Sequence, residues 1–315
     1  MEQSTSITIS VVVPVYNSEN SLAELVRRLQ AVLSPMTGDL EIILVNDGSR
    51  DRSWRVISDL VAEFPSVHGI NLMRNYGQHN ALLAGIRAAK HDIIVTLDDD
   101  LQNPPEEIPK LVAELEEHDV VYGTPAQEQH GLWRNLASQI TKLALQASMG
   151  VETARKVSAF RAFRTRLRNA FGDYRSPFLS IDVLLTWGTT RFTFVDVKHD
   201  ARTIGVSNYT FGKLVTHALN MVTGFSTLPL QMASLIGFGF TLFGMVVLAY
   251  VLGRFALEGG STVQGFPFLA SVIAIFSGAQ LFALGIIGEY LSRLHFRMME
   301  KPTYAVQEHL TNREE

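Results

Sequence analysis

Hydrophobic positions follow a repeating two-part pattern over the N-terminal part of the chain. A β-branched run over residues 7–15 predicts a strand, and the next stretch places its apolar residues on one face of a helix. Those helical positions are Leu22, Leu25, Val26, Leu29 and Leu33. Further apolar runs of strand length lie at residues 41–45, 69–73, 93–97 and 120–122. Short apolar strands that alternate with helices are typical of a mostly parallel sheet covered on both faces, so we predict an α/β fold.

The pattern becomes less regular further along the chain. We expect a helix over residues 132–143 and strands over residues 158–163 and 192–195. Residues 198–208 are polar and predict a loop. We therefore assign residues 1–208 to one α/β domain, which is long enough to bury a substantial core.

Two long uncharged stretches distinguish the C-terminal part. Residues 228–253 and 266–288 each exceed the roughly 20 residues that cross the hydrocarbon core of a bilayer. A chain with 27 Lys and Arg and 31 Asp and Glu has only Arg254, Glu258 and Glu289 between residues 214 and 292. We therefore predict a transmembrane hairpin over residues 228–290.

The segments that flank this hairpin suggest how it is oriented. Positive charges lie on both sides of it, at Lys213, Arg293, Arg297 and Lys301. Because cytoplasmic flanks are enriched in Lys and Arg, we expect both ends in the cytoplasm, with residues 291–315 as a cytoplasmic tail. Residues 209–227 have an apolar face and predict an interfacial amphipathic helix. The sequence thus predicts a multi-pass protein of the inner (plasma) membrane with a cytoplasmic α/β domain.

Overall charge and cysteine content exclude several classes of function. The net charge of -4 argues against a nucleic-acid partner, whose phosphates require clustered Lys and Arg. The absence of cysteine excludes disulfides, thiolate metal sites and cysteine nucleophiles. Small residues at Ala233, Gly237 and Thr241 recur at every fourth position and are compatible with a homo-oligomer.

Polar residues follow several predicted strands directly. Asn17, Asp47 and the Asp98 cluster emerge at strand ends. Ligands of open α/β sheets bind beyond the carboxyl ends of the strands, so we expect these residues to share one site. Arg74 follows the third strand and supplies a cation near the same edge.

Asp98 and Asp100 are the strongest candidates for chemistry. On an extended segment, residues two apart point the same way, so both carboxylates can share Mg²⁺ or Mn²⁺, with Gln102 as a further ligand. Such an ion binds phosphate oxygens, which suits a nucleoside diphosphate leaving group. The alternative is a solvated acidic turn that begins the helix at Pro104.

Four motifs carry a resemblance to a known family. Residues 12–17 (VVPVYN), 45–49 (VNDGS), 74–77 (RNYG) and 98–105 (DDDLQNPP) resemble the ordered motifs of family 2 glycosyltransferases with a GT-A fold. Residues 75–109 are similar to bacterial undecaprenyl-phosphate aminoarabinose transferases. That group of polyprenyl-phosphate glycosyltransferases also includes dolichyl-phosphate mannose synthases and bacteriophage-type glucosyl transferases. The resemblance extends to residues 288–291 (GEYL) and 301–304 (KPTY) and so covers nearly the whole chain.

The resemblance implies transfer of one sugar, with inversion, from a nucleotide diphosphate donor to the phosphate of a polyprenyl lipid. UDP and undecaprenyl phosphate are the favoured donor nucleotide and acceptor. Asp98, Asp100 and Gln102 are then expected to hold the metal and the diphosphate. The residues expected at the nucleotide are Pro14, Tyr16, Asn17, Asp47, Arg74, Asp98 and Asp99.

Three arginines are candidates for the acceptor side. A lipid phosphate is already ionised at neutral pH, so the nucleophile needs positioning and charge neutralisation, which a guanidinium fork supplies. Arg134, Arg161 and Arg202 lie in or beside matched motifs and join Asp98 and Asp100 as predicted catalytic residues. Arg134, Arg202 and Ser207 are expected to bind the acceptor phosphate.

Two other functions remain open at this point. A processive or glycan-elongating family 2 enzyme would share the sheet and the Asp98 cluster. A non-enzymatic membrane protein that senses nucleotides would share the nucleotide residues without transferring a sugar. Transfer of a sugar, and the length of the product, discriminates between these functions.

Overall fold

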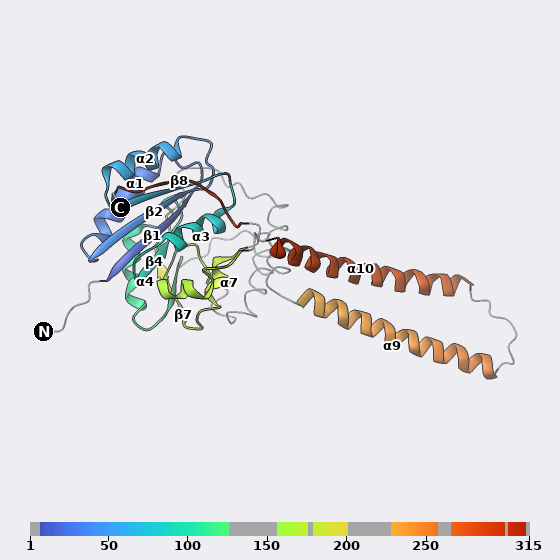
Figure 1. The fold of residues 1–315 in the computed structure, drawn as a ribbon. Coiled ribbons are helices and arrows are strands. Elements are labelled where there is room, and N and C mark those ends of the chain that lie inside the picture. Colours follow the sequence, from blue (N-terminus) through green and yellow to red (C-terminus); the bar gives the residue numbers. More distant parts are fainter. Residues whose placement is uncertain are drawn as a thin grey trace. The chain divides into compact units, whose positions relative to one another are not determined.

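The computed structural model of the 315-residue chain describes residues 7–125, 156–175, 179–200, 228–257, 266–299 and 302–312. The chain divides into two compact units (Figure 1). Unit 1 comprises Met1–Val215 and Glu300–Glu315, and unit 2 comprises Thr216–Met299. The predicted helices over residues 132–143 and 209–227 lie outside the described residues.

Unit 1 is built on an eight-stranded sheet with the order β7-β5-β6-β4-β1-β2-β3-β8. β1 pairs in parallel with β2 and β4, β2 with β3, and β5 with β7, whereas β6 and β8 pair antiparallel. The predicted mostly parallel α/β sheet is thereby confirmed. The strands are β1 (Thr8–Val15), β2 (Asp39–Asn46), β3 (Val67–Leu72), β4 (Ile93–Thr96), β5 (Val120–Pro125), β6 (Arg161–Arg164), β7 (Phe192–Val197) and β8 (Val306–Leu310).

Helices cover both faces of this sheet because the central strands are apolar on both sides. In β1, Val11 and Val13 pack with α1 (Leu22–Leu33), α2 (Ser53–Glu63) and α4 (Ile108–Glu114), which follows the short helix η1 (Pro105–Glu107). Val12 packs on the other face. That face is covered by α3 (Gln78–Ala88), η2 (Thr165–Ala170) and α7 (Ile181–Leu185). Two cores therefore hold the strands rigidly and fix where each strand ends.

Unit 2 contains two long apolar helices, α9 (Leu228–Leu257) and α10 (Phe266–Met298). Each includes an 18-residue window that is long and apolar enough to cross a membrane, Leu230–Val247 and Ile275–Ser292. Only 6% and 0% of these windows are buried inside the protein, unlike the core helix of a globular domain. The side chains that face outwards need an apolar surrounding, so these helices fit the predicted transmembrane hairpin. Both helices extend beyond the predicted spans.

The segment after α10, part of the predicted C-terminal tail, contains a strand. Its strand β8 pairs antiparallel with β3 and forms an edge of the sheet in unit 1. This strand has no hydrophobic pattern that would predict it, because VQEHL is mostly polar and exposed. Both ends of the hairpin therefore connect to the same unit.

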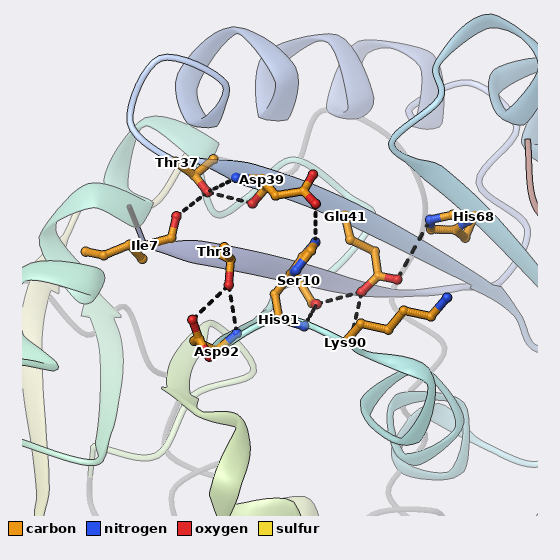
Figure 2. A network of polar contacts seen from close by, with 10 residues as sticks. All are labelled: Ile7, Thr8, Ser10, Thr37, Asp39, Glu41, His68, Lys90, His91 and Asp92. Atoms are coloured by element: carbon orange, nitrogen blue, oxygen red, sulfur yellow. Dashed lines mark hydrogen bonds and ion pairs between the residues drawn. The ribbon is translucent and has the colours of Figure 1, made fainter. Parts of the chain in front are cut away.

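A buried polar network lies where the parallel strands begin (Figure 2). The Glu41 carboxylate accepts hydrogen bonds from Ser10 Oγ (2.6 Å) and from the Lys90 backbone N–H (3.1 Å). His68 Nε2 lies 3.7 Å from its other oxygen, and the His91 backbone N–H donates to Ser10 Oγ at 3.2 Å. We call this side of the sheet, where the parallel strands begin, the amino edge. The opposite side, where β1 to β4 finish, is the carboxyl edge. Both names refer to the ends of strands and not to the outermost strands β7 and β8.

Candidate active site

The loops after β1 and β2 are joined to each other at the carboxyl edge. The Asn17 backbone N–H donates to Ser49 Oγ at 3.0 Å, and the Arg50 backbone N–H donates to Asn17 Oδ1 at 2.8 Å. Ser18 N–H donates to Ser53 Oγ at 2.8 Å, at the start of α2. Asn17 has a φ of 57°, a left-handed conformation that asparagine tolerates better than most residues. The predicted nucleotide residue Asn17 is thus held in a fixed and strained turn.

Asp47 joins the β2 loop to the segment after β3. Its carboxylate accepts hydrogen bonds from the backbone N–H groups of Tyr76 (2.7 Å) and Gly77 (2.9 Å), and its side chain is only 3% exposed. Burial raises the pKa of Asp47, while the two N–H donors act in the opposite direction. We expected Asp47 to contact the nucleoside. In the structure both of its oxygens hold residues 74–77, which we call the rim.

Gly48 allows the rim to approach the β2 loop. It has a φ of 65°, and a Cβ at this position would lie 2.5 Å from the Asn75 backbone N. No larger residue fits without moving the backbone. Three predicted nucleotide residues are exposed at this edge. They are Asn17, Tyr16, which is 38% exposed, and Arg74, whose guanidinium lies 4.8 Å from the centre of the Tyr76 ring. Pro14, by contrast, is buried within β1.

The Asp98 cluster is arranged differently from the prediction. β4 ends at Thr96, and the chain then turns, with a φ of 60° at Leu101, so the alternation of an extended strand does not apply. Gln78 Nε2 donates to Asp98 Oδ1 at 2.6 Å, and the Gln102 backbone N–H donates to Asp100 Oδ1 at 3.2 Å. We predicted no role for Gln78 from the sequence. Its only signals were its place at the start of a helix and within a matched motif.

Asp99 has a separate structural task within this cluster. Its carboxylate accepts the Tyr16 backbone N–H at 3.1 Å and thereby ties the β4 loop to the β1 loop. Burial raises the pKa of Asp99, the negative charge of Asp100 adds to this effect, and the hydrogen bonds from Ser18 and Tyr16 oppose it. Asp98 and Asp100 are thereby left as the carboxylates suited to a ligand.

This donor set fits a divalent cation that is completed by substrate. Among the described residues, no group of three or more His, Cys, Asp or Glu side chains could hold a metal ion by itself. Mg²⁺ and similar ions are commonly held by one or two carboxylates together with substrate phosphates and water. Asp98 and Asp100 are two half-buried carboxylates of one loop and offer oxygen ligands of this kind.

Arg161 lies beneath the site and not at its surface. It is 1% exposed, and its guanidinium donates to Asp182 and, at 3.1 Å, to Thr96 Oγ1. Tyr122 donates its hydroxyl to the same Asp182 carboxylate at 3.2 Å. Burial raises the pKa of Tyr122 well above its usual value, so the phenol stays a donor. We expected Arg161 to act at the acceptor phosphate, but its guanidinium is enclosed and braces the end of β4.

The remaining acceptor candidates cannot be placed in the same way. Arg134, Arg202 and Ser207 lie outside the described residues. Their predicted roles stay predictions. Within the described part of the chain, the loops after β1, β2, β3 and β4 come together at the carboxyl edge.

Backbone strain is confined to this edge. Among the described residues, φ is positive at Asn17 (57°), Gly48 (65°), Gly77 (92°) and Leu101 (60°), each in one of these four loops. Strained conformations persist where the surrounding structure over-determines them, and they cluster at ligand sites. Exposed polar groups, two half-buried carboxylates and loops joined by hydrogen bonds lie together at this edge.

Comparisons with known proteins match most of the chain. A family model described as "Glycosyl transferase family 2" matches residues 10–176. An undecaprenyl-phosphate 4-deoxy-4-formamido-L-arabinose transferase from Shewanella sediminis is 40% identical over 307 residues, covering 95% of this chain and 92% of that protein. A protein of the same name from an Enterobacter species is 39% identical, with the same coverage.

Solved structures share the fold at low sequence identity. A crystal structure described only as a mycobacterial protein has 17% identity and a TM-score of 0.51, covering 69% of this chain and 73% of that one. Glucosyl-3-phosphoglycerate synthase from Mycobacterium tuberculosis has 19% identity and a TM-score of 0.49, covering 69% and 76%. The first of these likenesses supports the α/β fold of unit 1.

Proposed function

The chain belongs to glycosyl transferase family 2, and from this we propose that it transfers a single sugar from a nucleoside diphosphate donor to a polyprenyl phosphate, with inversion at the anomeric carbon. A UDP-linked sugar is the proposed donor, and undecaprenyl phosphate is the proposed acceptor. The protein is accordingly an enzyme, a glycosyltransferase.

One observation carries this proposal. The similarity to the undecaprenyl-phosphate transferases spans 95% of the chain and so includes both the sheet of unit 1 and the helices of unit 2. A processive synthase or a soluble glycosyltransferase would share the sheet alone. The combination of a nucleotide-type edge with an apolar hairpin suits an enzyme with a water-soluble donor and an acceptor held in lipid.

We assign the donor to the carboxyl edge. Asp98 and Asp100, with Gln102, would hold Mg²⁺ or Mn²⁺, which when bound supplies charge neutralisation at the leaving diphosphate. Tyr16, Asn17 and the exposed guanidinium of Arg74 would contact the nucleotide, while Asp47 acts through the rim that it holds.

The reaction needs little proton transfer. An oxygen of the ionised lipid phosphate attacks the anomeric carbon, the bond from that carbon to the donor phosphate breaks, and the nucleoside diphosphate leaves with the electron pair. Catalysis then depends on positioning and on stabilising negative charge. Arg134, Arg202 and Ser207 are the proposed ligands of the acceptor phosphate. We propose that the hairpin crosses the plasma membrane and that unit 1 lies in the cytoplasm, where nucleotide sugars are made.

A donor screen tests the proposal. Purified full-length protein in detergent is given undecaprenyl phosphate, Mg²⁺ or Mn²⁺ and a panel of UDP-linked and GDP-linked sugars, and lipid products are separated by mass. We expect one donor class to yield a lipid that gains a single sugar, and a chelator to stop the reaction until metal is restored. A product with several sugars would indicate a processive enzyme. Nucleotide binding without transfer from any donor would indicate a sensor and contradict the proposal.

A further inference from the structure

We propose that the segment that follows the hairpin, residues 302–310, is a positioning element of the donor site because it holds the rim in place. This inference rests on the proposed function only for the identity of the ligand. The segment, which we call the return strand, includes β8 and the residues that lead into it. Its partner β3 leads directly into the rim.

The backbone contacts run up to the rim itself. β8 pairs with β3 through Gly69 and Leu310 at one end and through Leu72 and Val306 at the other. The Met73 backbone N–H then donates to the Ala305 carbonyl at 2.9 Å, one residue before Arg74. β3 would otherwise be the edge of the sheet and would reach the rim with one side unpaired.

Side chains of the return strand anchor it beside the rim. Arg87 of α3 donates to Thr303 Oγ1 at 3.4 Å, and its guanidinium lies 5.5 Å from the centre of the Tyr304 ring. Thr303 is buried, and Tyr304 packs against the same apolar cluster as Tyr76, a residue of the rim. Arg87 also donates to the Gly172 and Tyr174 carbonyls, so this anchor is itself held by another part of unit 1.

The rim is therefore clamped from two directions. On one side Asp47 and Gly48 fix it to the β2 loop, and on the other side the return strand fixes the residue that precedes it. Gly77 within the rim has a φ of 92°, which glycine adopts readily, so the fixed shape of the rim comes from its contacts. If one clamp is removed, the donor has to order the rim when it binds, and that entropy cost lowers affinity.

The position of this clamp in the chain has a consequence for assembly. The return strand is made only after the hairpin, because α10 ends at Met298 and β8 begins at Val306. The donor site is complete only when the end of the chain has returned to unit 1. Donor binding is thereby linked to correct formation of the hairpin.

Matched substitutions of the full-length protein in detergent test the clamp. Tyr304→Ala removes the ring that packs against the same apolar cluster as Tyr76 of the rim. Tyr304→Phe keeps that ring and its contact with Arg87. Glu308→Ala removes the contact of the return strand with Trp54 Nε1 (3.2 Å), on the α2 side, and controls for general loosening of β8.

Two readouts separate positioning from mere stabilisation. We expect Tyr304→Ala to speed backbone hydrogen exchange over residues 73–77 and to leave exchange in β5 unchanged. UDP binding should weaken about fivefold or more, because the ligand then has to order the rim when it binds. The KM for the donor should rise while kcat and the KM for polyprenyl phosphate stay close to wild type. Tyr304→Phe and Glu308→Ala should resemble wild type in all of these measurements.

The outcomes are distinguishable from failure of the proposed function. Unchanged exchange over residues 73–77 in folded Tyr304→Ala protein would overturn the clamp. If Tyr304→Ala does not fold, Tyr304→Leu keeps apolar bulk without the aromatic face, and the same exchange criterion applies to it. If wild-type protein binds no UDP and transfers no sugar, the proposed function fails, and the exchange measurement still decides whether the return strand holds the rim.

Discussion

The amino edge and the carboxyl edge of the sheet in unit 1 both contain buried acidic residues, but the carboxyl edge adds half-buried carboxylates beside them in strained loops. At the amino edge, the Glu41 carboxylate is 6% exposed and is occupied by Ser10 Oγ, the Lys90 N–H and His68 (Figure 2). At the carboxyl edge, Asp47 and Asp99 are occupied in a similar way by backbone N–H groups. Asp98 and Asp100 lie beside them in strained loops and are only half-buried.

The difference teaches which polar residues indicate function. A saturated polar network joins strands and stabilises the fold, wherever it lies. A site requires in addition polar groups that neighbouring residues hold in position and that can still bind a ligand. Backbone strain that the fold maintains is a further sign of a site. Within the described residues, positive φ values occur at the carboxyl edge and not at the amino edge.

The largest expected effect on sugar transfer comes from substitution of Asp98 or Asp100. Asp98→Asn and Asp100→Asn should each lower the rate of sugar transfer by about 10²–10³-fold or more, the range seen when a group that stabilises transition-state charge is removed. Both variants should fold and insert in membranes, since neither carboxylate is part of the core. Transfer assays beside thermal unfolding of the same samples check this. Wild-type turnover in either variant would remove the metal assignment.

Substitution of Gly48 should affect stability and donor binding together. In Gly48→Ala the new Cβ meets the Asn75 backbone N at 2.5 Å and the positive φ is strained, so we expect a loss of about 1–3 kcal/mol in the free energy of unfolding. The displaced rim should raise the KM for the donor more than it lowers kcat. A variant with unchanged donor KM would show that the rim does not contact the nucleotide.

The matching substitution at the amino edge should separate stability from activity. Glu41→Gln leaves one of the buried donors around this side chain without its acceptor, so we expect a loss of about 1–3 kcal/mol in the free energy of unfolding. The transfer rate and the donor KM of the folded protein should equal those of wild type. A selective loss of transfer in this variant would contradict the distinction between the two edges.

The smallest effect concerns acid stability at the amino edge. Burial acts to raise the pKa of Asp119, but hydrogen bonds from Thr189 and Arg166 outweigh it and lower the pKa below 3.8. A lowered pKa contributes stability above pH 3.8, and this contribution is lost as the pH falls through the folded value. Asp119→Asn should therefore be less stable than wild type at neutral pH, and the difference should shrink towards pH 3. Urea unfolding across this range measures it. A constant difference would contradict the assignment.

Local patterns in the sequence were sufficient to predict much of unit 1. The alternation of apolar strands and helices, and the rule that ligands bind where parallel strands end, placed Asn17, Asp47 and Asp98 at one edge, as the structure has them. The apolar windows of α9 and α10 were equally visible, because length and composition alone define them.

Contacts between distant segments account for what was not predicted. Nothing local to Arg161 shows that Asp182 and Thr96 enclose it, and nothing local to Asp47 shows that its oxygens are occupied by the rim. β8 was not predicted because an edge strand with one neighbour needs no apolar pattern, and VQEHL is mostly polar and exposed. Each of these residues still lies near the predicted site, but it acts by holding other residues.

We expect the nucleotide donor to bind at the carboxyl edge and not at the amino edge. The direct test is backbone hydrogen exchange of the full-length wild-type protein in detergent, with and without UDP and Mn²⁺. We predict that ligand slows exchange over residues 14–17, 46–49, 74–78 and 97–102 and leaves residues 39–41, 67–69 and 90–93 of the amino edge unchanged. Protection confined to the amino edge, or no protection at a UDP concentration that supports transfer, would contradict the account.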